Sequence, residues 1–159
     1  TTNHDESAKM SPTKEFGDVR GSMAAFVLTT YLHGGALIYG SQEAGYPEAI
    51  NFFTYVPVDW TGNSELYQEY CRLMALYNEY PAIRKGGLKT YPQPDVLLFE
   101  KQDGKDRVLV AVNVRNREVN VTLPQEWNGH PSRDMYSGTE KKLEAELSLC
   151  PYQYRIFKY

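Results

Sequence analysis

The sequence predicts an α/β segment over residues 1–87, followed by an all-β antiparallel sandwich over residues 88–159. In the first segment, apolar residues recur at three- and four-residue spacings on either side of one short apolar run. From residue 88 onward, apolar and polar residues alternate, which is the period of strands with one buried face. The chain has 159 residues with 42% apolar and 13% aromatic content, which is typical of a core-forming protein.

The first long helix is expected over residues 19–33. Asp18 can cap its start, because a carboxylate accepts hydrogen bonds from the unpaired N–H groups of the first turn. Gly34 can end the helix in a left-handed conformation. The residues that fall at helical spacing are Val19, Met23, Phe26, Val27, Thr30 and Tyr31.

Residues 35–40 form a short apolar run bounded by glycines, which predicts one buried strand of the kind found in parallel sheets. A second helix follows a long loop that contains proline and aromatic residues. Asn63 or Ser64 can cap this helix, and Pro81 lies near its end. Its apolar stripe consists of Leu66, Tyr70, Leu73, Tyr77 and Tyr80. The order helix, strand, helix is that of an α/β unit.

The second segment reads as a series of strands separated by turn residues. The turns are predicted at residues 103–104, 116–117, 128–129 and 137–138, three of which contain glycine. The expected strands are residues 96–101, 107–114, 118–123, 143–149 and 152–159. Apolar and polar residues alternate strictly over residues 119–123 and 143–149, so one face is expected to be buried and the other wet.

Charge and cysteine content exclude several function classes. A net charge of -3, from 17 basic and 20 acidic residues spread along the chain, gives no footprint for nucleic acid or an anionic membrane. No apolar run approaches the ~20 residues that cross a bilayer. Cys71 and Cys150 are expected to be buried free thiols, and no Cys, His or acidic spacing predicts a metal site. His33 and His130 are expected to be structural or exposed.

The motifs resemble one known family over essentially the whole chain. Residues 1–5, TTNHD, resemble the seventh-strand motif of the α-amylase superfamily of retaining glycoside hydrolases, and residues 35–43, GALIYGSQE, resemble its eighth-strand segment. Residues 66–86 look like the eighth barrel helix, and residues 96–113 look like the opening hairpin of domain C. The resemblance therefore implies that residues 1–87 are the end of a (β/α)8 barrel, with its last strand and last two helices, and that residues 88–159 are domain C.

The resemblance also implies site residues. Asp5 matches the catalytic carboxylate that accepts hydrogen bonds from ring hydroxyls and stabilises the transition state, while His4 and Asn3 match the substrate-binding positions beside it. The nucleophile and the acid/base belong to strands that these residues do not include, so the 159-residue chain is expected to be inactive alone. The alternative interpretation of residues 3–5 is a polar turn that caps a helix.

The implied substrate is an α-glucan or maltooligosaccharide. The alternatives are a related α-glucosyltransferase, or a noncatalytic sandwich that binds carbohydrate or supports a neighbouring domain. The resemblance implies no cofactor in this chain and leaves room for a structural calcium site upstream. The helices are expected to pack irregularly on the sandwich, to associate with a second copy, or to remain bound to the missing part of the barrel.

Three further expectations concern side chains outside the motif. Glu43 is expected to be structural, closing the loop after the eighth strand. Arg20 and Glu6 form either an ion pair that supports the site or two solvated charges. The aromatic residues after residue 45 either stack on glucose units or pack beneath their loop; they are Tyr46, Phe52, Phe53, Tyr55 and Trp60.

Overall fold

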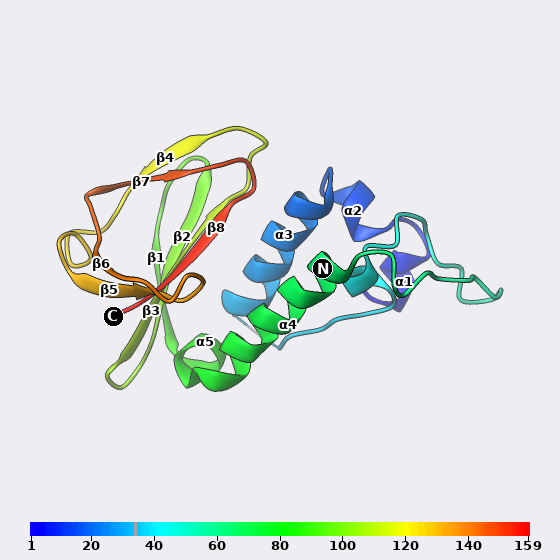
Figure 1. Cartoon of the computed structure of the whole chain (residues 1–159), viewed down its shortest axis with the longest axis horizontal. Helices are drawn as coiled ribbons and strands as arrows, with labels where there is room; N and C mark the ends of the chain where they lie inside the picture. Colours follow the sequence, from blue (N-terminus) through cyan, green and yellow to red (C-terminus); the bar gives the residue numbers. More distant parts are fainter. Residues whose placement is uncertain (34) are drawn as a thin grey trace.

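The computed structural model describes residues 1–33 and 35–159 and places helices on one side of a β sandwich (Figure 1). The helical part comes first in the chain. Its elements are α1 (His4–Ser7), α2 (Pro12–Glu15), α3 (Val19–Tyr31), the 3-10 helix η1 (Gln42–Ala44), α4 (Ser64–Glu79) and α5 (Pro81–Lys85). The strands are β1 (Gly87–Tyr91), β2 (Val96–Asp103), β3 (Asp106–Asn113), β4 (Val119–Thr122), β5 (Pro131–Asp134), β6 (Glu140–Lys142), β7 (Glu146–Leu149) and β8 (Tyr154–Lys158).

The strands form two antiparallel sheets. The larger sheet has six strands in the order β1-β2-β3-β8-β5-β6, and the smaller one pairs β4 with β7. The register of the central pair aligns Phe99 with Val110, and Val110 in turn with Ile156. The predicted antiparallel sandwich is therefore confirmed.

Both faces of the central strand β3 are buried. Val108, Leu109, Val110, Ala111 and Val112 of β3 are all fully buried. Leu109 and Ala111 face the smaller sheet and the indole of Trp127, whereas the three valines face the helices. The helical part therefore covers the second face of β3, whereas the alternation predicted for residues 119–122 is confirmed in β4, where Val119 and Val121 are buried and Asn120 and Thr122 are exposed.

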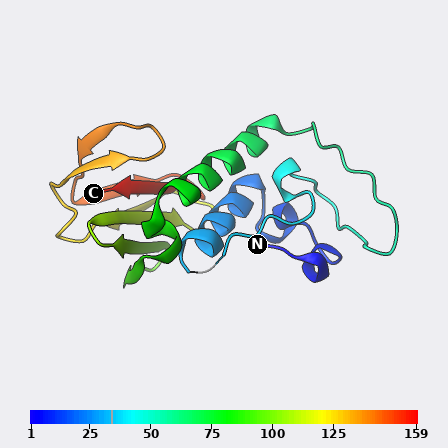
Figure 2. The same ribbon diagram turned by 90° about the horizontal axis from the view of Figure 1, so that it is seen from below.

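Helices α3 and α4 lie side by side and pack against the larger sheet (Figures 1 and 2). Phe26, Val27 and Tyr31 of α3 are fully buried, as is Leu73 of α4, so the predicted stripes are confirmed. The Tyr31 hydroxyl donates to the backbone carbonyl of Leu73 at 2.7 Å and ties the two helices together. Of the three expected alternatives, the structure contains packing on the sandwich, with one core shared by the helices and the larger sheet. Association with a second copy or with the missing part of the barrel stays a prediction.

The N-terminal ends of α3 and α4 were predicted correctly, whereas the C-terminal end of α3 was not. The N–H of Gly21 donates to Asp18 Oδ1 at 2.8 Å, and the N–H of Leu66 donates to Asn63 Oδ1 at 3.1 Å. Helix α3 ends at Tyr31 rather than residue 33. The proposed stop at Gly34 lies outside the described residues.

Residues 35–40 do not form the predicted strand. They are irregular, and none of the described strands pairs with them. A strand needs a neighbour to satisfy its backbone N–H and C=O groups. The apolar pattern of this run is thus not sufficient to make it a strand within this chain.

Three strands of the larger sheet were missed. Strands β1, β5 and β6 lie at or next to the edges of the sheet and carry few apolar residues, so alternation gave no signal. Glycine identified the turns better: Gly104, Gly129 and Gly138 all have positive φ. The predicted strand over residues 143–149 is shorter, because only Glu146–Leu149 pairs with β4.

Both cysteines are exposed, which corrects the prediction of buried thiols. Cys71 follows Tyr70 on α4 and therefore points about 100° away from the buried stripe. Cys150 lies just after β7, in the turn that leads to β8. Within the described part of the chain, no helix is long and apolar enough to cross a membrane.

Candidate functional site

Asn3 caps a short helix at the start of the chain. Its Oδ1 accepts hydrogen bonds from the N–H groups of Asp5 at 2.9 Å and Glu6 at 3.0 Å, which opens α1. The capping turn that the sequence left as an alternative is thus the local structure of residues 3–5. The cap also fixes the orientation of the two residues that follow it.

His4 and Asp5 project into solvent beside each other. His4 Nε2 lies 3.4 Å from Asp5 Oδ1, and the two side chains are 66% and 68% exposed. The His4 ring meets the edge of the Tyr39 ring, with their centroids 6.4 Å apart. An exposed carboxylate beside an imidazole and an aromatic ring can accept hydrogen bonds from the hydroxyl groups of a ligand.

The fold brings together the two sequence motifs that resemble barrel strands. Thr1 Oγ1 lies 3.3 Å from Gln42 Oε1, and the amide of Gln42 donates to the Tyr70 hydroxyl at 3.4 Å. Burial raises the pKa of Tyr70 to about 12, so this hydroxyl stays protonated at neutral pH. Residues 1–5 and 35–43 are therefore neighbours at one end of α4, although about thirty residues separate them.

Glu43 lies in η1, and its Oε2 is buried without a hydrogen-bond partner in the described chain. Its structural role stays a prediction. Arg20 does not pair with Glu6: Arg20 binds Asp18 at 3.0 Å, while Glu6 binds Lys9 at 3.0 Å. These are exposed charges, so the alternative of solvated side chains is the correct one.

The loop between η1 and α4 extends away from the sandwich (Figure 2) and exposes its aromatic side chains. Phe52, Phe53, Tyr55 and Trp60 are between 51% and 91% exposed. The rings of Phe52 and Phe53 lie 4.4 Å apart, measured between centroids. Within this chain these four rings do not pack beneath their loop.

No group of three or more His, Cys, Asp and Glu side chains is arranged to hold a metal ion among residues 1–33 and 35–159. The side chains of residues 3–5 offer hydrogen bonding and charge.

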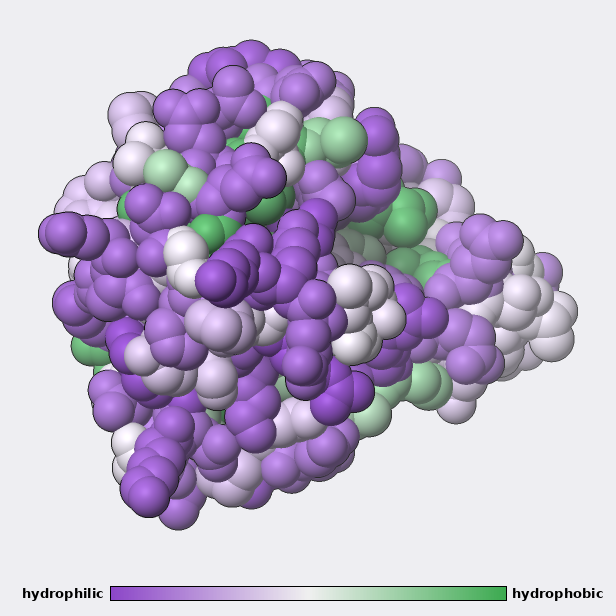
Figure 3. All heavy atoms as spheres, turned by 60° about the vertical axis from the view of Figure 1, so that its left-hand side comes forward, coloured by the Kyte–Doolittle hydropathy of each residue, from purple (hydrophilic) through white to green (hydrophobic). Residues whose placement is uncertain are grey.

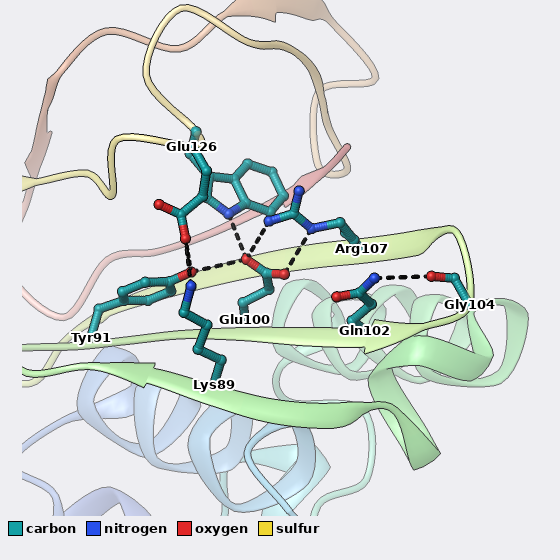
Figure 4. A network of polar contacts seen from close by, with 8 residues as sticks. Lys89, Tyr91, Glu100, Gln102, Gly104, Arg107 and Glu126 are labelled. Atoms are coloured by element: carbon teal, nitrogen blue, oxygen red, sulfur yellow. Dashed lines mark hydrogen bonds and ion pairs between the residues drawn. The ribbon is translucent and has the colours of Figure 1, made fainter.

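A second concentration of charge lies inside the sandwich and was missed by sequence reasoning (Figure 4). The Glu100 carboxylate is buried and accepts two hydrogen bonds from Arg107, at 2.8 and 2.9 Å. It also accepts from Trp127 Nε1 at 2.8 Å and from the Tyr91 hydroxyl at 3.1 Å. Because protein donors fill its acceptor sites, this carboxylate joins β1, β2, β3 and the loop after β4 rather than binding a ligand.

Neighbouring groups extend this network to the surface. Glu126 accepts from Lys89 Nζ at 2.6 Å and from the Tyr91 hydroxyl at 2.7 Å. The hydrogen bond from Lys89 lowers the pKa of Glu126 to about 2. The sequence signal that could have revealed the network is a charged residue, Glu100, directly after the apolar run of residues 96–99 in the same strand.

Glu100→Gln should destabilise the fold by about 1.5–3 kcal/mol at neutral pH, the range for hydrogen bonds to charged groups. Burial alone raises the pKa of Glu100, but the bonds from Arg107, Trp127 and Tyr91 outweigh it and hold the pKa below its usual value. A lowered pKa stabilises the fold above the unfolded-state pKa, and this contribution is lost as the pH falls through the folded-state pKa. Urea unfolding of both proteins from pH 7 to pH 3 measures the difference.

The two stability curves should converge as the pH falls below the ordinary carboxyl range. Glu118→Gln is the matched control, because the Glu118 side chain is exposed and bonds only to the Ser148 hydroxyl in the described structure. A difference between wild type and Glu100→Gln that stays constant with pH would contradict the assigned charge state of Glu100.

The sandwich matches a known family. A sequence profile described as "Maltogenic Amylase, C-terminal domain" matches residues 88–156. A curated cyclomaltodextrinase from Geobacillus thermopakistaniensis is 28% identical over 152 residues, covering 89% of this chain and 26% of that protein. The chain thus spans about a quarter of the length of that relative.

Solved structures share the fold. AmyP in complex with maltose superposes with a TM-score of 0.72 at 18% identity, covering 88% of this chain and 34% of that one. The trehalulose synthase MutB from Pseudomonas mesoacidophila superposes with a TM-score of 0.52 at 24% identity, covering 60% of this chain and 18% of that one. Residues 88–156 therefore match the C-terminal domain of maltogenic amylases, and the chain as a whole is similar to the C-terminal part of α-amylase family enzymes.

Proposed function

We propose that this chain is the C-terminal part of a retaining glycoside hydrolase that acts on α-glucans. The observation that carries the proposal is the meeting of two motifs: His4 and Asp5 lie exposed beside Tyr39, while Thr1 contacts Gln42. The family of the sandwich supports it. Two AmyP complexes contain maltose and maltotriose, which favours an α-glucan or maltooligosaccharide as the substrate of the proposed enzyme.

In this proposal residues 1–87 complete a (β/α)8 barrel and residues 88–159 are domain C. Helices α3 and α4 are the last two barrel helices, and residues 35–40 become a strand once a neighbouring barrel strand pairs with them. Catalytic groups of such barrels lie at the carboxyl ends of the strands. Residues 3–5 precede α3 and residues 41–43 follow the proposed strand, so both belong to that catalytic face.

Asp5 acts on the sugar at the cleavage point. Its carboxylate accepts hydrogen bonds from ring hydroxyls, and charge-assisted bonds of this kind are about twice as strong as neutral ones. They strengthen as the ring flattens toward the oxocarbenium-like transition state, so they lower the barrier more than they tighten substrate binding. His4 donates to the same sugar, and Asn3 holds both residues in place through the helix cap.

The nucleophile and the general acid are assigned to polypeptide outside these 159 residues. A retaining mechanism needs both, and Asp5 has neither role here. The chain's own contribution is therefore to position the sugar, to stabilise the transition state and to support the barrel with the sandwich.

The purified 159-residue chain should release no reducing sugar from starch, maltooligosaccharides or an isomaltose-type substrate, because it supplies one of three required carboxylates. The longer protein that contains it should hydrolyse at least one of them. Release of reducing sugar is measured for both against a blank without protein. Turnover by the chain alone would contradict the proposed division of the catalytic groups, and inactivity of the longer protein on every α-glucoside would contradict the function.

A further inference from the structure

A cleft of about 870 Å³ lies between the N-terminal halves of α3 and α4 and the sandwich. Figure 3 shows hydrophobic side chains at the bottom of a hollow on the face where these two parts meet. Met23 and Leu66 come from the helices, while Tyr136, Tyr152, Tyr154 and Gln153 come from the sandwich. Ligand pockets are of this size and are mostly apolar with a few polar groups, and they favour the boundary between structural units.

Apart from Glu65, which is exposed, the charged side chains of the cleft are paired with protein groups. Arg155 binds Asp134, and Arg20 binds Asp18. The Glu69 carboxylate accepts hydrogen bonds from the hydroxyls of Tyr136 and Tyr154. Because protein groups already occupy the side chains of Arg155, Arg20 and Glu69, the cleft favours a neutral ligand rich in hydroxyls over a small ion.

Tyr152 is the one residue other than glycine that has a positive φ in the described chain, at 57°. Large side chains avoid this region, and such backbone strain concentrates at functional positions. The N–H of Tyr152 donates to the Arg115 carbonyl at 3.1 Å, which holds the turn. The Tyr152 hydroxyl reaches Gly17, where an added Cβ would lie 3.3 Å from it. The strained turn thus holds an aromatic side chain in the wall of the cleft.

We propose that this cleft is an accessory binding site for a neutral oligosaccharide, separate from the residues around Asp5. A sugar ring has a flat apolar face that packs on tyrosine rings and an edge of hydroxyls that pairs with polar side chains such as Gln153. The choice of an α-glucan as the occupant rests on the proposed function. Residues 3–5 line no part of this cleft, so the two sites are distinct.

Maltoheptaose titrated into the 159-residue chain tests the proposal, with binding followed by calorimetry and by chemical shifts of backbone amides. We expect millimolar or tighter binding with shift changes at residues 134–137 and 150–155. Tyr152→Asn removes the ring and places a residue that tolerates positive φ, so it should keep the fold and weaken binding at least tenfold. Ser137→Trp fills the exposed rim of the cleft and should weaken binding to a similar extent.

Two control variants separate this site from the others. Phe53→Ala removes an exposed ring from the loop before α4, and Asp5→Asn alters the proposed catalytic position; neither should change binding by more than twofold. Thermal unfolding reports whether each variant is folded. If Tyr152→Asn fails to fold, Ser137→Trp decides the question, because residue 137 is exposed.

Several results would overturn the inference. They are the absence of binding at millimolar maltoheptaose in 10-fold excess over the chain, binding that Asp5→Asn abolishes, and binding that both cleft variants retain. Light scattering adds one more: a dimer that Ser137→Trp converts to a monomer would show that a second copy occupies the cleft. If the cleft binds no maltoheptaose but the longer protein hydrolyses an α-glucan, the accessory site is wrong and the proposed function stands. If the longer protein hydrolyses no α-glucan, the proposed function is wrong, and binding to the cleft can still be measured.

Discussion

Asp5→Asn in the longer enzyme should lower kcat by three or more orders of magnitude, which corresponds to about 4 kcal/mol of lost transition-state stabilisation. The amide keeps the size of the side chain and removes the charge. It can still accept a weak hydrogen bond from a sugar hydroxyl, but it cannot respond to the positive charge that develops on the ring. KM should therefore change much less than kcat.

Steady-state kinetics on a maltooligosaccharide, with binding measured separately, checks this split between kcat and KM. Glu6→Gln is the matched control, since Glu6 lies next to Asp5 on α1, is exposed and pairs with Lys9. It should retain kcat within a few fold. Near-normal kcat/KM for Asp5→Asn on every α-glucoside tested would show that Asp5 does not have the assigned role.

The sequence predicted the helices and strands whose apolar residues are buried within this chain. Asp18 and Asn63 identified the starts of α3 and α4, because capping depends on residues a few positions away. Strands β2 and β3 were found because their apolar runs are long. Strands β5 and β6 could not be found, because polar edge strands are defined by their pairing partners.

The candidate site was predicted through resemblance and not through geometry. Residues 3–5 alone are compatible with a helix cap, and the structure contains that cap. What sequence spacing could not give is the approach of Thr1 to Gln42 and of His4 to Tyr39, which depends on tertiary packing. The same limit explains why the Glu100 network and the cleft beside Tyr152 were missed: both join residues from elements distant in sequence.

Phe26 gives the clearest test of how the helical part and the sandwich depend on each other. The side chain is fully buried in the cluster that α3 shares with Phe99, Val110 and Ile156 of the larger sheet. Its ring also packs against Tyr70 of α4, with centroids 4.6 Å apart. Irregular packing of the helices on the sandwich was one alternative that the sequence left open, whereas a shared core predicts that the two parts unfold together.

Phe26→Ala should lower the free energy of unfolding by about 3–5 kcal/mol, because it removes buried apolar area and leaves a cavity between helix and sheet. Urea unfolding is followed in the same samples by circular dichroism for the helices and by tryptophan fluorescence for the sandwich. A Trp60→Phe background leaves Trp127, which lies within the sandwich, as the one tryptophan. Both transitions should shift together to lower urea. Thr29→Ala on the exposed face of the same helix is the control and should cost well under 1 kcal/mol. If the helical signal shifts alone while the sandwich transition stays in place, the sandwich is stable without the helices, and the burial of both faces of β3 contributes little to its folding.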